Sequence, residues 1–197
     1  IDRAIRLANQ MLALAKVEQL RQQDAPQALD LCEPVREVAL DLAPLIADKE
    51  LDFELEADQP VWIEGHAWML RELTRNLLHN AIRATPAGAP LVVSVDSVAS
   101  SSAAPLARLR VRDSGPGLDA ARRAHLYEPF HTGTASGTTS GSGLGLAICR
   151  QICERLGGEI QLVNRCSDAA PGGLDAIVTL PAAAPTTAPP HATQSTP

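Results

Sequence analysis

The chain has 197 residues, which is enough for one domain of ordinary size and a short appendage. Apolar residues make up 45% of the chain and aromatic residues only 3%, so we expect a hydrophobic core that is aliphatic. The formal net charge of -6 argues against a nucleic-acid-binding protein and against a polybasic membrane-surface module. No apolar run approaches the ~20 residues of a membrane span, and we expect no signal peptide within these residues. Because the chain begins with Ile1 and not with Met, we expect it to be part of a longer protein.

The four cysteines do not indicate a disulfide framework or a metal site, because they form no CxxC pair and no His/Cys ligand spacing. Cys149 and Cys153 lie four residues apart in a predicted helix and therefore share one face of it. Free cysteine is among the most frequently buried residue types. We expect these two side chains to be buried.

Residues 1–23 are predicted to form a helix, in which Ile1, Ile5, Ala8 and Leu12 recur at spacings of three and four. A second apolar stripe runs beside the first, which suits a helix packed in a bundle better than one lying on a sheet. A surface helix of the main domain is the alternative. Residues 24–30 contain Asp24-Ala25-Pro26 and are interpreted as a linker.

Residues 31–181 are predicted to form one α+β domain. The expected elements are helices over 31–49, 66–84 and 144–156, and strands over 51–56, 61–64, 91–98, 106–112, 159–163 and 176–180. Asp30 is a candidate cap for the first of these helices. Most strands follow one another as hairpins, which favours a two-layer α/β sandwich with helices on one face of a mixed sheet. Residues 182–197 are rich in Ala, Pro and Thr and are interpreted as a disordered tail.

The helix over 66–84 carries a narrow polar stripe beside an apolar face. Glu72, Asn76, Asn80 and Arg83 fall within an arc of roughly 80° at about 100° per residue. The apolar face consists of Leu70, Leu73, Leu77, Ala81 and Ala84, extended by Leu78 and Ile82. Solvent exposure can explain two asparagines four residues apart. The alternative is that their side-chain oxygens bind a hard cation such as Mg²⁺, with the arginine facing phosphate oxygens.

Two glycine-containing segments follow. The first, Asp113-Ser-Gly115-Pro-Gly117, comes at the end of a strand and can be a simple turn. Alternatively, its Asp113 carboxylate accepts a hydrogen bond from an amino group such as that of adenine. Residues 140–146 open the last helix with alternating glycines, which suits either a flexible linker or a loop whose N–H groups bind an anion. This segment is neither a Walker A loop nor a dinucleotide-binding fingerprint.

Taken together and in this order, the motifs resemble those of the Bergerat-fold ATPases, and most closely the sensor histidine kinases of two-component systems. Residues 76–86 match the N box of that family, residues 113–117 the G1 box, residues 127–130 the F box and residues 141–146 the G2 box. Gly157-Gly158 follows in the usual place. The resemblance covers about residues 30–181, and the F box distinguishes the kinases from the topoisomerase, mismatch-repair and chaperone relatives.

The resemblance implies an ATP and Mg²⁺ site. Asn76 would bind Mg²⁺ with Asn80 beside it, Arg83 would contact phosphate, and Asp113 would hold the adenine amine. Glu72 would assist phosphoryl transfer together with Asn76. The remaining residues implied to shape or line the nucleotide site are Gly115, Gly117, Phe130, Gly141, Ser142, Gly143, Leu144 and Gly145. Residues 118–141 would form a mobile lid that Phe130 anchors.

The first helix resembles the second helix of the kinase dimerisation hairpin, but the phosphoacceptor histidine motif of the family is absent. None of the five histidines has the required neighbours, and His79 is interpreted as structural. We therefore expect an ATP-binding catalytic domain that does not autophosphorylate alone. A further departure is Ile177, which stands where the family often has Phe.

The implied partners are a histidine-bearing dimerisation helix of the same protein and a response regulator, in a homodimeric full-length protein. The implied location is the cytoplasmic side of an inner-membrane sensor. Two alternatives remain. One is a serine kinase of the anti-sigma type, and the bundle-like first helix argues against it because those kinases lack such a helix. The other is a non-catalytic nucleotide sensor, and the complete set of ATP-binding motifs argues against it.

Overall fold

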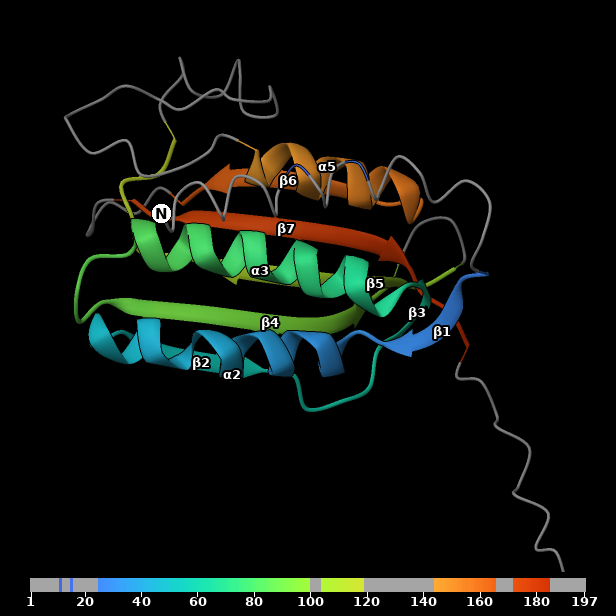
Figure 1. Ribbon diagram of the computed structural model, residues 1–197, viewed down its shortest axis with the longest axis horizontal. Helices are drawn as coiled ribbons and strands as arrows, with labels where there is room; N and C mark the ends of the chain where they lie inside the picture. The colour runs from blue at the N-terminus through green and yellow to red at the C-terminus, as the bar shows by residue number, and fades with distance from the viewer. Residues whose placement is uncertain are drawn as a thin grey trace, which may run out of the picture.

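The computed structural model describes residues 25–99, 104–118, 144–165 and 172–184, together with Met11 and Ala15. In chain order the elements are β1 (Gln27–Asp30), α2 (Cys32–Asp48), β2 (Asp52–Glu56), β3 (Trp62–Gly65), α3 (Ala67–Ala84), β4 (Pro90–Val98), β5 (Leu106–Arg112), α5 (Gly145–Arg155), β6 (Glu159–Asn164) and β7 (Leu174–Pro181). Helices α2, α3 and α5 lie side by side on one face of the main sheet (Figure 1).

The main sheet has five strands in the order β2-β4-β5-β7-β6. Strand β2 runs parallel to β4, and the other neighbours in this sheet are antiparallel. The predicted hairpin of β4 and β5 is present, with Val93 opposite Val111. The prediction of a two-layer α/β sandwich with helices on one face of a mixed sheet is therefore confirmed.

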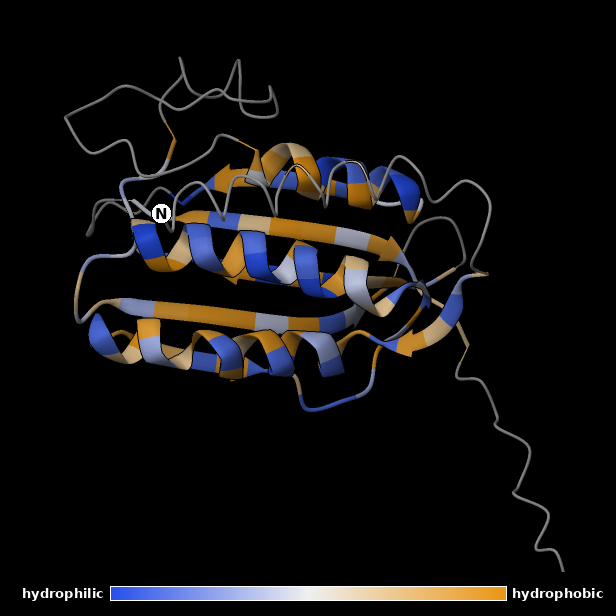
Figure 2. Ribbon diagram, in the orientation of Figure 1, coloured by the Kyte–Doolittle hydropathy of each residue, from blue (hydrophilic) through white to orange (hydrophobic). Residues whose placement is uncertain are grey.

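The core between the two layers is aliphatic, as the composition predicts. Helix α3 lies between α2 and α5, and its Leu70, Leu73 and Leu78 are fully buried against the sheet. Strands β4 and β7 are mostly hydrophobic, and hydrophilic residues gather on the outer surfaces of the helices (Figure 2). Ala84 does not join the apolar face as predicted: it is exposed, because it ends α3 just before the chain turns toward β4.

Cys149 and Cys153 are buried on α5, as expected from their spacing. The Sγ atom of Cys149 donates a hydrogen bond to the carbonyl of Leu73 on α3 at 3.8 Å. Burial raises the pKa of the Cys153 thiol to about 12, which keeps it protonated. Both cysteines therefore contribute to packing between α3 and α5.

Strand β1 corrects the predicted linker over residues 24–30. Residues 27–30 pair antiparallel with β3 in a separate two-stranded sheet, so they belong to the domain. Asp30 ties this strand to its neighbours, since its Oδ1 accepts hydrogen bonds from the N–H groups of Cys32 and Val61, each at 3.0 Å. The predicted cap is therefore wrong by one residue, because Leu31 is the N-cap of α2 and makes no side-chain cap bond. The Asp30 carboxylate instead bonds the first residue of α2 and the residue before β3.

The structured domain also extends past its predicted end at Pro181. Ala182 forms a bridge with Ile63, and the N–H of Ala183 donates to the carbonyl of Trp62 at 2.7 Å. The predicted disordered tail therefore cannot begin at residue 182, and residues 185–197 lie outside the described part of the chain. Within the described part, no helix has the length and apolar character that crossing a membrane requires.

The predicted helix over residues 1–23 also lies mostly outside the described residues. Met11 and Ala15 are helical and exposed, and they are the only two residues of this segment that the structure describes.

The C-terminal end of α3 is held by two groups from outside the helix. Lys49, which follows α2, donates from Nζ to the carbonyls of Ile82 at 2.7 Å and Arg83 at 2.9 Å. Thr85 donates from Oγ1 to the carbonyl of Ala81 at 2.8 Å. These bonds satisfy carbonyls that the end of a helix leaves without an intrahelical donor, and the lysine charge complements the helix dipole. The last turn of α3 is therefore fixed in position.

Two fully buried threonines near this helix should respond in opposite ways to replacement by valine. Thr74 Oγ1 has no hydrogen-bond partner among the described residues, whereas Thr85 Oγ1 is bonded. A buried hydroxyl without a partner costs about 1–3 kcal/mol. We expect Thr74→Val to raise the free energy of unfolding by about 1 kcal/mol and Thr85→Val to lower it by a similar amount. Urea unfolding measures both, and equal effects of the two variants would contradict this assignment.

Candidate functional site

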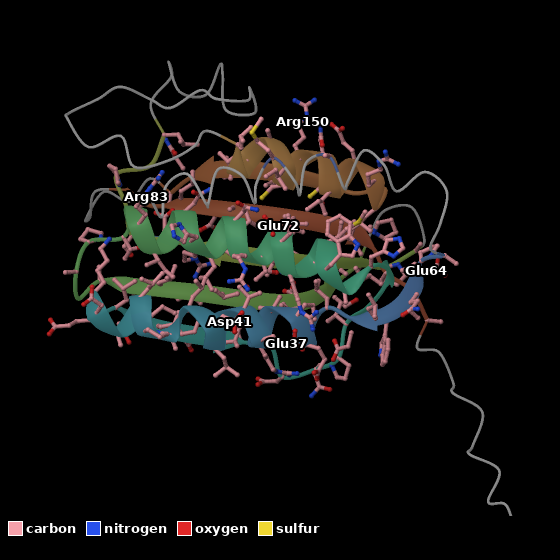
Figure 3. The ribbon with its side chains drawn as sticks, viewed as in Figure 1. Glu37, Asp41, Glu64, Glu72, Arg83 and Arg150 are labelled. Atoms are coloured by element: carbon pink, nitrogen blue, oxygen red, sulfur yellow. The ribbon has the colours of Figure 1, made fainter. Side chains whose placement is uncertain are left out.

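The predicted polar residues run along α3 from its middle to its C-terminal end, beside the start of α5 and the segment that follows β5. Glu72 lies near the middle of α3 and Arg83 near its C-terminal end (Figure 3). A Cβ atom placed on Gly145, the first residue of α5, would lie 3.0 Å from Asn76 Oδ1 and 3.7 Å from Asn80 Nδ2. The start of α5 can approach the asparagines of α3 this closely because residue 145 has no side chain.

Asn76 is held in one orientation by Glu72, one turn earlier on α3. Its Nδ2 donates to the carboxylate Oε1 of Glu72 and to the backbone carbonyl of the same residue, both at 2.9 Å. The side chain is largely buried, with 7% of Asn76 exposed. Because Nδ2 points at Glu72, Oδ1 points toward the start of α5. An amide oxygen presented in this way can act as a ligand for a hard cation.

Asp113 follows the last residue of β5 and is 5% exposed. Its backbone N–H donates to the carbonyl of Leu174 at 3.0 Å, which continues the pairing of β5 with β7. Its Oδ1 accepts the N–H of Gly115 at 2.8 Å and the N–H of Leu174 at 3.1 Å. Within the described residues, both bonds that this carboxylate accepts go to Oδ1. Oδ2 is therefore available to accept a hydrogen bond from a ligand.

Burial raises the pKa of the Asp113 carboxyl above its usual value of 3.8, because it removes the charged form from water. The two backbone N–H bonds and the positive charge of Arg165 oppose this effect, and the negative charge of Asp175 adds to it. Burial is the largest of these influences. The folded protein thus holds a carboxylate that would be more stable in water.

Glycines allow the segment after Asp113 to pack closely. A Cβ atom on Gly115 would lie 2.9 Å from both Cβ and the carbonyl oxygen of Ala84, at the end of α3. Gly117 has a φ of 72°, in the left-handed region that glycine adopts readily. The next residue, Leu118, is bonded twice by the Asn164 side chain, which accepts its N–H and donates to its carbonyl, each at 2.8 Å. The path of the chain is fixed as far as Leu118.

Sequence reasoning missed the residues of β6 and β7 that surround Asp113. Asn164, Arg165 and Leu174 contact residues 113–118 although they are 46 to 61 positions away in the chain. None of them belongs to a motif of the resemblance, so only the pairing of β5 with β7 brings them to the site. Arg165 donates from Nη2 to the backbone carbonyl of Asp113.

Some predicted site residues are not tested by the structure. Phe130, Gly141, Ser142 and Gly143 lie outside the described residues, as does most of the predicted lid. Leu144 is described, and its side chain is fully buried in the core. Any contact of Leu144 with a ligand would therefore involve its backbone.

The described groups fit a nucleotide with a divalent cation. A buried carboxylate oxygen can accept an amino group, an amide oxygen can bind a cation, and the exposed Arg83 can reach phosphate. The described residues contain no cluster of three or more His, Cys, Asp or Glu side chains suited to a metal ion. A cation held here would take its other ligands from water and phosphate, which is the usual coordination of Mg²⁺.

Comparisons with known proteins agree with this geometry. A family model described as histidine kinase-, DNA gyrase B- and HSP90-like ATPase matches residues 65–184. The sensor protein QseC of Salmonella typhi is 34% identical over 90% of this chain and 37% of its own length. The swarming motility regulation sensor protein RssA of Serratia marcescens is 29% identical over 92% of this chain and 37% of its own length. This chain thus spans little more than a third of these relatives.

A solved structure of the catalytic domain of the histidine kinase ThkA, in a nucleotide-free form, gives a TM-score of 0.67 at 28% identity. The match covers 80% of this chain and 98% of that domain. The N-box helix, the G1 segment and the start of the G2 helix therefore lie within a fold already known to be that of a kinase catalytic domain. The chain belongs to the histidine kinase-, DNA gyrase B- and HSP90-like ATPase family, and within it is an ATP-binding catalytic domain of the sensor histidine kinase type.

Proposed function

We propose that this domain binds Mg·ATP where α3, the segment after β5 and the start of α5 meet. In the full-length protein it would transfer the γ-phosphoryl group to a histidine on a dimerisation helix outside this chain. The observation that carries the proposal is Asp113, a buried carboxylate whose Oδ1 is occupied by backbone donors and whose Oδ2 is left for a ligand. Burying such a group is costly, and groups buried at such a cost are concentrated at functional sites.

Adenine recognition falls to Asp113, with Oδ2 accepting the exocyclic amine of the base. Gly115 and Gly117 would shape the pocket beside this carboxylate. A side chain on Gly115 would collide with the end of α3, and one on Gly117 would lie 3.0 Å from Asn164 Oδ1. The two backbone donors on Oδ1 hold the carboxyl plane in one orientation. Guanine carries a carbonyl where adenine has this amine, so two hydrogen-bond acceptors, the carbonyl and the carboxylate Oδ2, would face each other. The site should therefore prefer ATP to GTP.

The phosphates would lie between α3 and the N-terminus of α5. Asn80 and Arg83 supply donors from α3, and Gly145 lets the backbone come close. Asn76 would bind Mg²⁺ through Oδ1, and the ion would neutralise charge that develops on the phosphates. Glu72 would hold the Asn76 amide in place through its 2.9 Å hydrogen bond. Gly141, Ser142, Gly143, Leu144 and Phe130 remain predicted contributors from the segment before α5.

The names of the relatives support the proposed partners. These relatives are named as sensor proteins and sensor kinases, which supports a two-component system with a response regulator that receives the phosphoryl group. We infer a homodimeric full-length protein that places this domain on the cytoplasmic side of an inner membrane. The predicted dimerisation helix over residues 1–23 would connect the domain to the histidine-bearing helix.

Phosphoryl transfer tests this function directly. The chain is incubated with radiolabelled ATP, Mg²⁺ and the histidine-bearing hairpin of its full-length protein. We expect acid-labile phosphate on the hairpin and none on the chain alone. Acid-stable phosphate on serine would instead indicate an anti-sigma type kinase. ATP binding without any transfer would indicate a nucleotide sensor.

Asp113→Asn should weaken ATP binding. The substitution keeps an oxygen for the N–H groups of Gly115 and Leu174 but places an amide NH₂ opposite the adenine amine. Losing a charge-assisted hydrogen bond costs about 1.5–3 kcal/mol, so we expect the Kd for ATP to rise about tenfold or more. Isothermal titration calorimetry measures the change. Equal affinity of the unmodified chain for ATP and GTP would contradict the assignment of this pocket.

The same substitution should stabilise the domain without nucleotide. Because the pKa of Asp113 is raised in the folded state, the contribution of this carboxyl to stability falls as pH rises from below 3.8 through the pKa of the folded form. The amide of the Asp113→Asn variant does not titrate, so the advantage of the variant should be absent in acid and present at about pH 7. Urea unfolding at both pH values checks this. A variant that is less stable than the parent at neutral pH would overturn the interpretation of Asp113 as a destabilising charge.

Asn76→Ala should remove the dependence of ATP binding on Mg²⁺. In the unmodified chain we expect Mg²⁺ to tighten ATP binding, and in the variant ATP should bind about equally with and without the ion. Arg75→Ala is a matched control on the same helix, since Arg75 forms a surface ion pair with Asp41 at 2.6 Å. The control should retain the Mg²⁺ effect. Retention of the full effect in Asn76→Ala would show that the ion is held elsewhere.

A further inference from the structure

Arg165 connects the β6–β7 hairpin to the carboxylate proposed to recognise adenine. It comes directly after β6, and its Nη2 donates to the backbone carbonyl of Asp113. Its own N–H donates to the carbonyl of Gly173 at 2.9 Å, which closes the hairpin just before β7. The guanidinium is therefore anchored at its backbone and bonded at its tip.

Gly173 provides the space that this contact needs. A Cβ atom at this position would collide with Arg165 Nη2 and with the carbonyl oxygen of Asp113, and would lie 2.9 Å from Arg165 Nε. The φ of Gly173 is 150°, a conformation that other residues seldom adopt. The absence of a side chain at residue 173 is thus required for the guanidinium to reach Asp113.

Asp175 forms an ion pair with the same guanidinium but no hydrogen bond to its Nε atom. Its Oδ1 lies 3.5 Å from Arg165 Nε and 3.4 Å from Arg112 Nε. The Asp175 side chain is 15% exposed, whereas those of Arg165 and Arg112 are 36% and 38% exposed, so water partly screens these pairs. The positive charge of Arg165 also lowers the pKa of Asp113, against the larger effect of burial. The charge of Arg165 thus favours the ionised carboxylate, the form that accepts a hydrogen bond.

We propose that Arg165 is a positioning residue for adenine specificity, which fixes the main chain of Asp113 so that its carboxylate meets the amine of the base. Leu174 bonds the same residue through its N–H and its carbonyl, and Asn164 holds Leu118 at the other end of the segment. The end of the β6–β7 hairpin thus clamps residues 113–118 at both ends. Arg165 is the member of this clamp that also carries a charge toward the carboxylate. This inference rests on the proposed function.

The test compares ATP with inosine triphosphate, which carries a carbonyl in place of the amine. In Arg165→Gln we expect the Kd for ATP to rise about fivefold and that for inosine triphosphate to change less than about twofold, so that discrimination falls. Arg165→Lys keeps the charge and one donor and should give an intermediate ratio. Arg108→Gln is the control. Arg108 lies on β5, the strand that leads to Asp113, and forms an ion pair with Asp96 on β4, not with Asp113. The control should leave the ratio unchanged.

The outcomes separate the two proposals. If the unmodified chain does not bind ATP, the proposed function itself fails. If it binds ATP with preference over inosine triphosphate and both Arg165 variants keep that preference, the positioning role is wrong. A loss of affinity for both nucleotides by the same factor would show a structural role only, and would also overturn it. Should Arg165→Gln not fold, Arg165→Lys decides: an intermediate ratio supports the role and an unchanged ratio contradicts it.

Discussion

The arrangement of this domain depends on keeping one carboxylate buried at the end of a strand. Asp113 is 5% exposed, and burial of its charge opposes folding. The fold compensates with the N–H groups of Gly115 and Leu174 and with the positive charge of Arg165. Leu174 and Arg165 come from β7 and the hairpin before it, so the antiparallel pairing of β5 with β7 is a condition for the site. A sheet with another strand order would leave this carboxylate without these two partners.

Helix α3 serves the core and the site with two faces of the same element. Its leucines pack against the sheet, and its Asn76 and Asn80 lie beside the start of α5. Lys49 and Thr85 bond the carbonyls of its last turn, which fixes the backbone of Arg83. The same residues therefore serve stability and function at this end of the sandwich. At Asp113 the two requirements conflict, because the charge that would bind nucleotide also destabilises the fold.

Much of this organisation is predictable from local signals. The alternation of apolar residues predicts strands such as β4 and β5, and the polar stripe on α3 predicts which side chains share a face.

The short range of these patterns also explains what sequence reasoning misses. Residues 27–30 fall within a predicted linker because a four-residue strand next to Pro26 carries almost no periodicity, and its pairing with β3 is a long-range contact. Arg165, Asn164 and Leu174 reach the segment that begins at Asp113 only through the topology of the sheet, and neither composition nor spacing marks them. The roles of Asn76, Asn80, Arg83 and Asp113 come from the resemblance, and their assignment to Mg·ATP stays a prediction.

We propose one site for the nucleotide, at the end of the sandwich where α3 and β5 end and α5 begins. Hydrogen exchange of the chain with and without Mg·ATP tests it most directly, since it reports each amide separately. We expect added protection in the last turns of α3, in residues 113–118 and in the first turn of α5. We expect no change at the opposite end of the domain, in β1 and β3. Protection confined to β1 and β3, with none near Asp113, would contradict it.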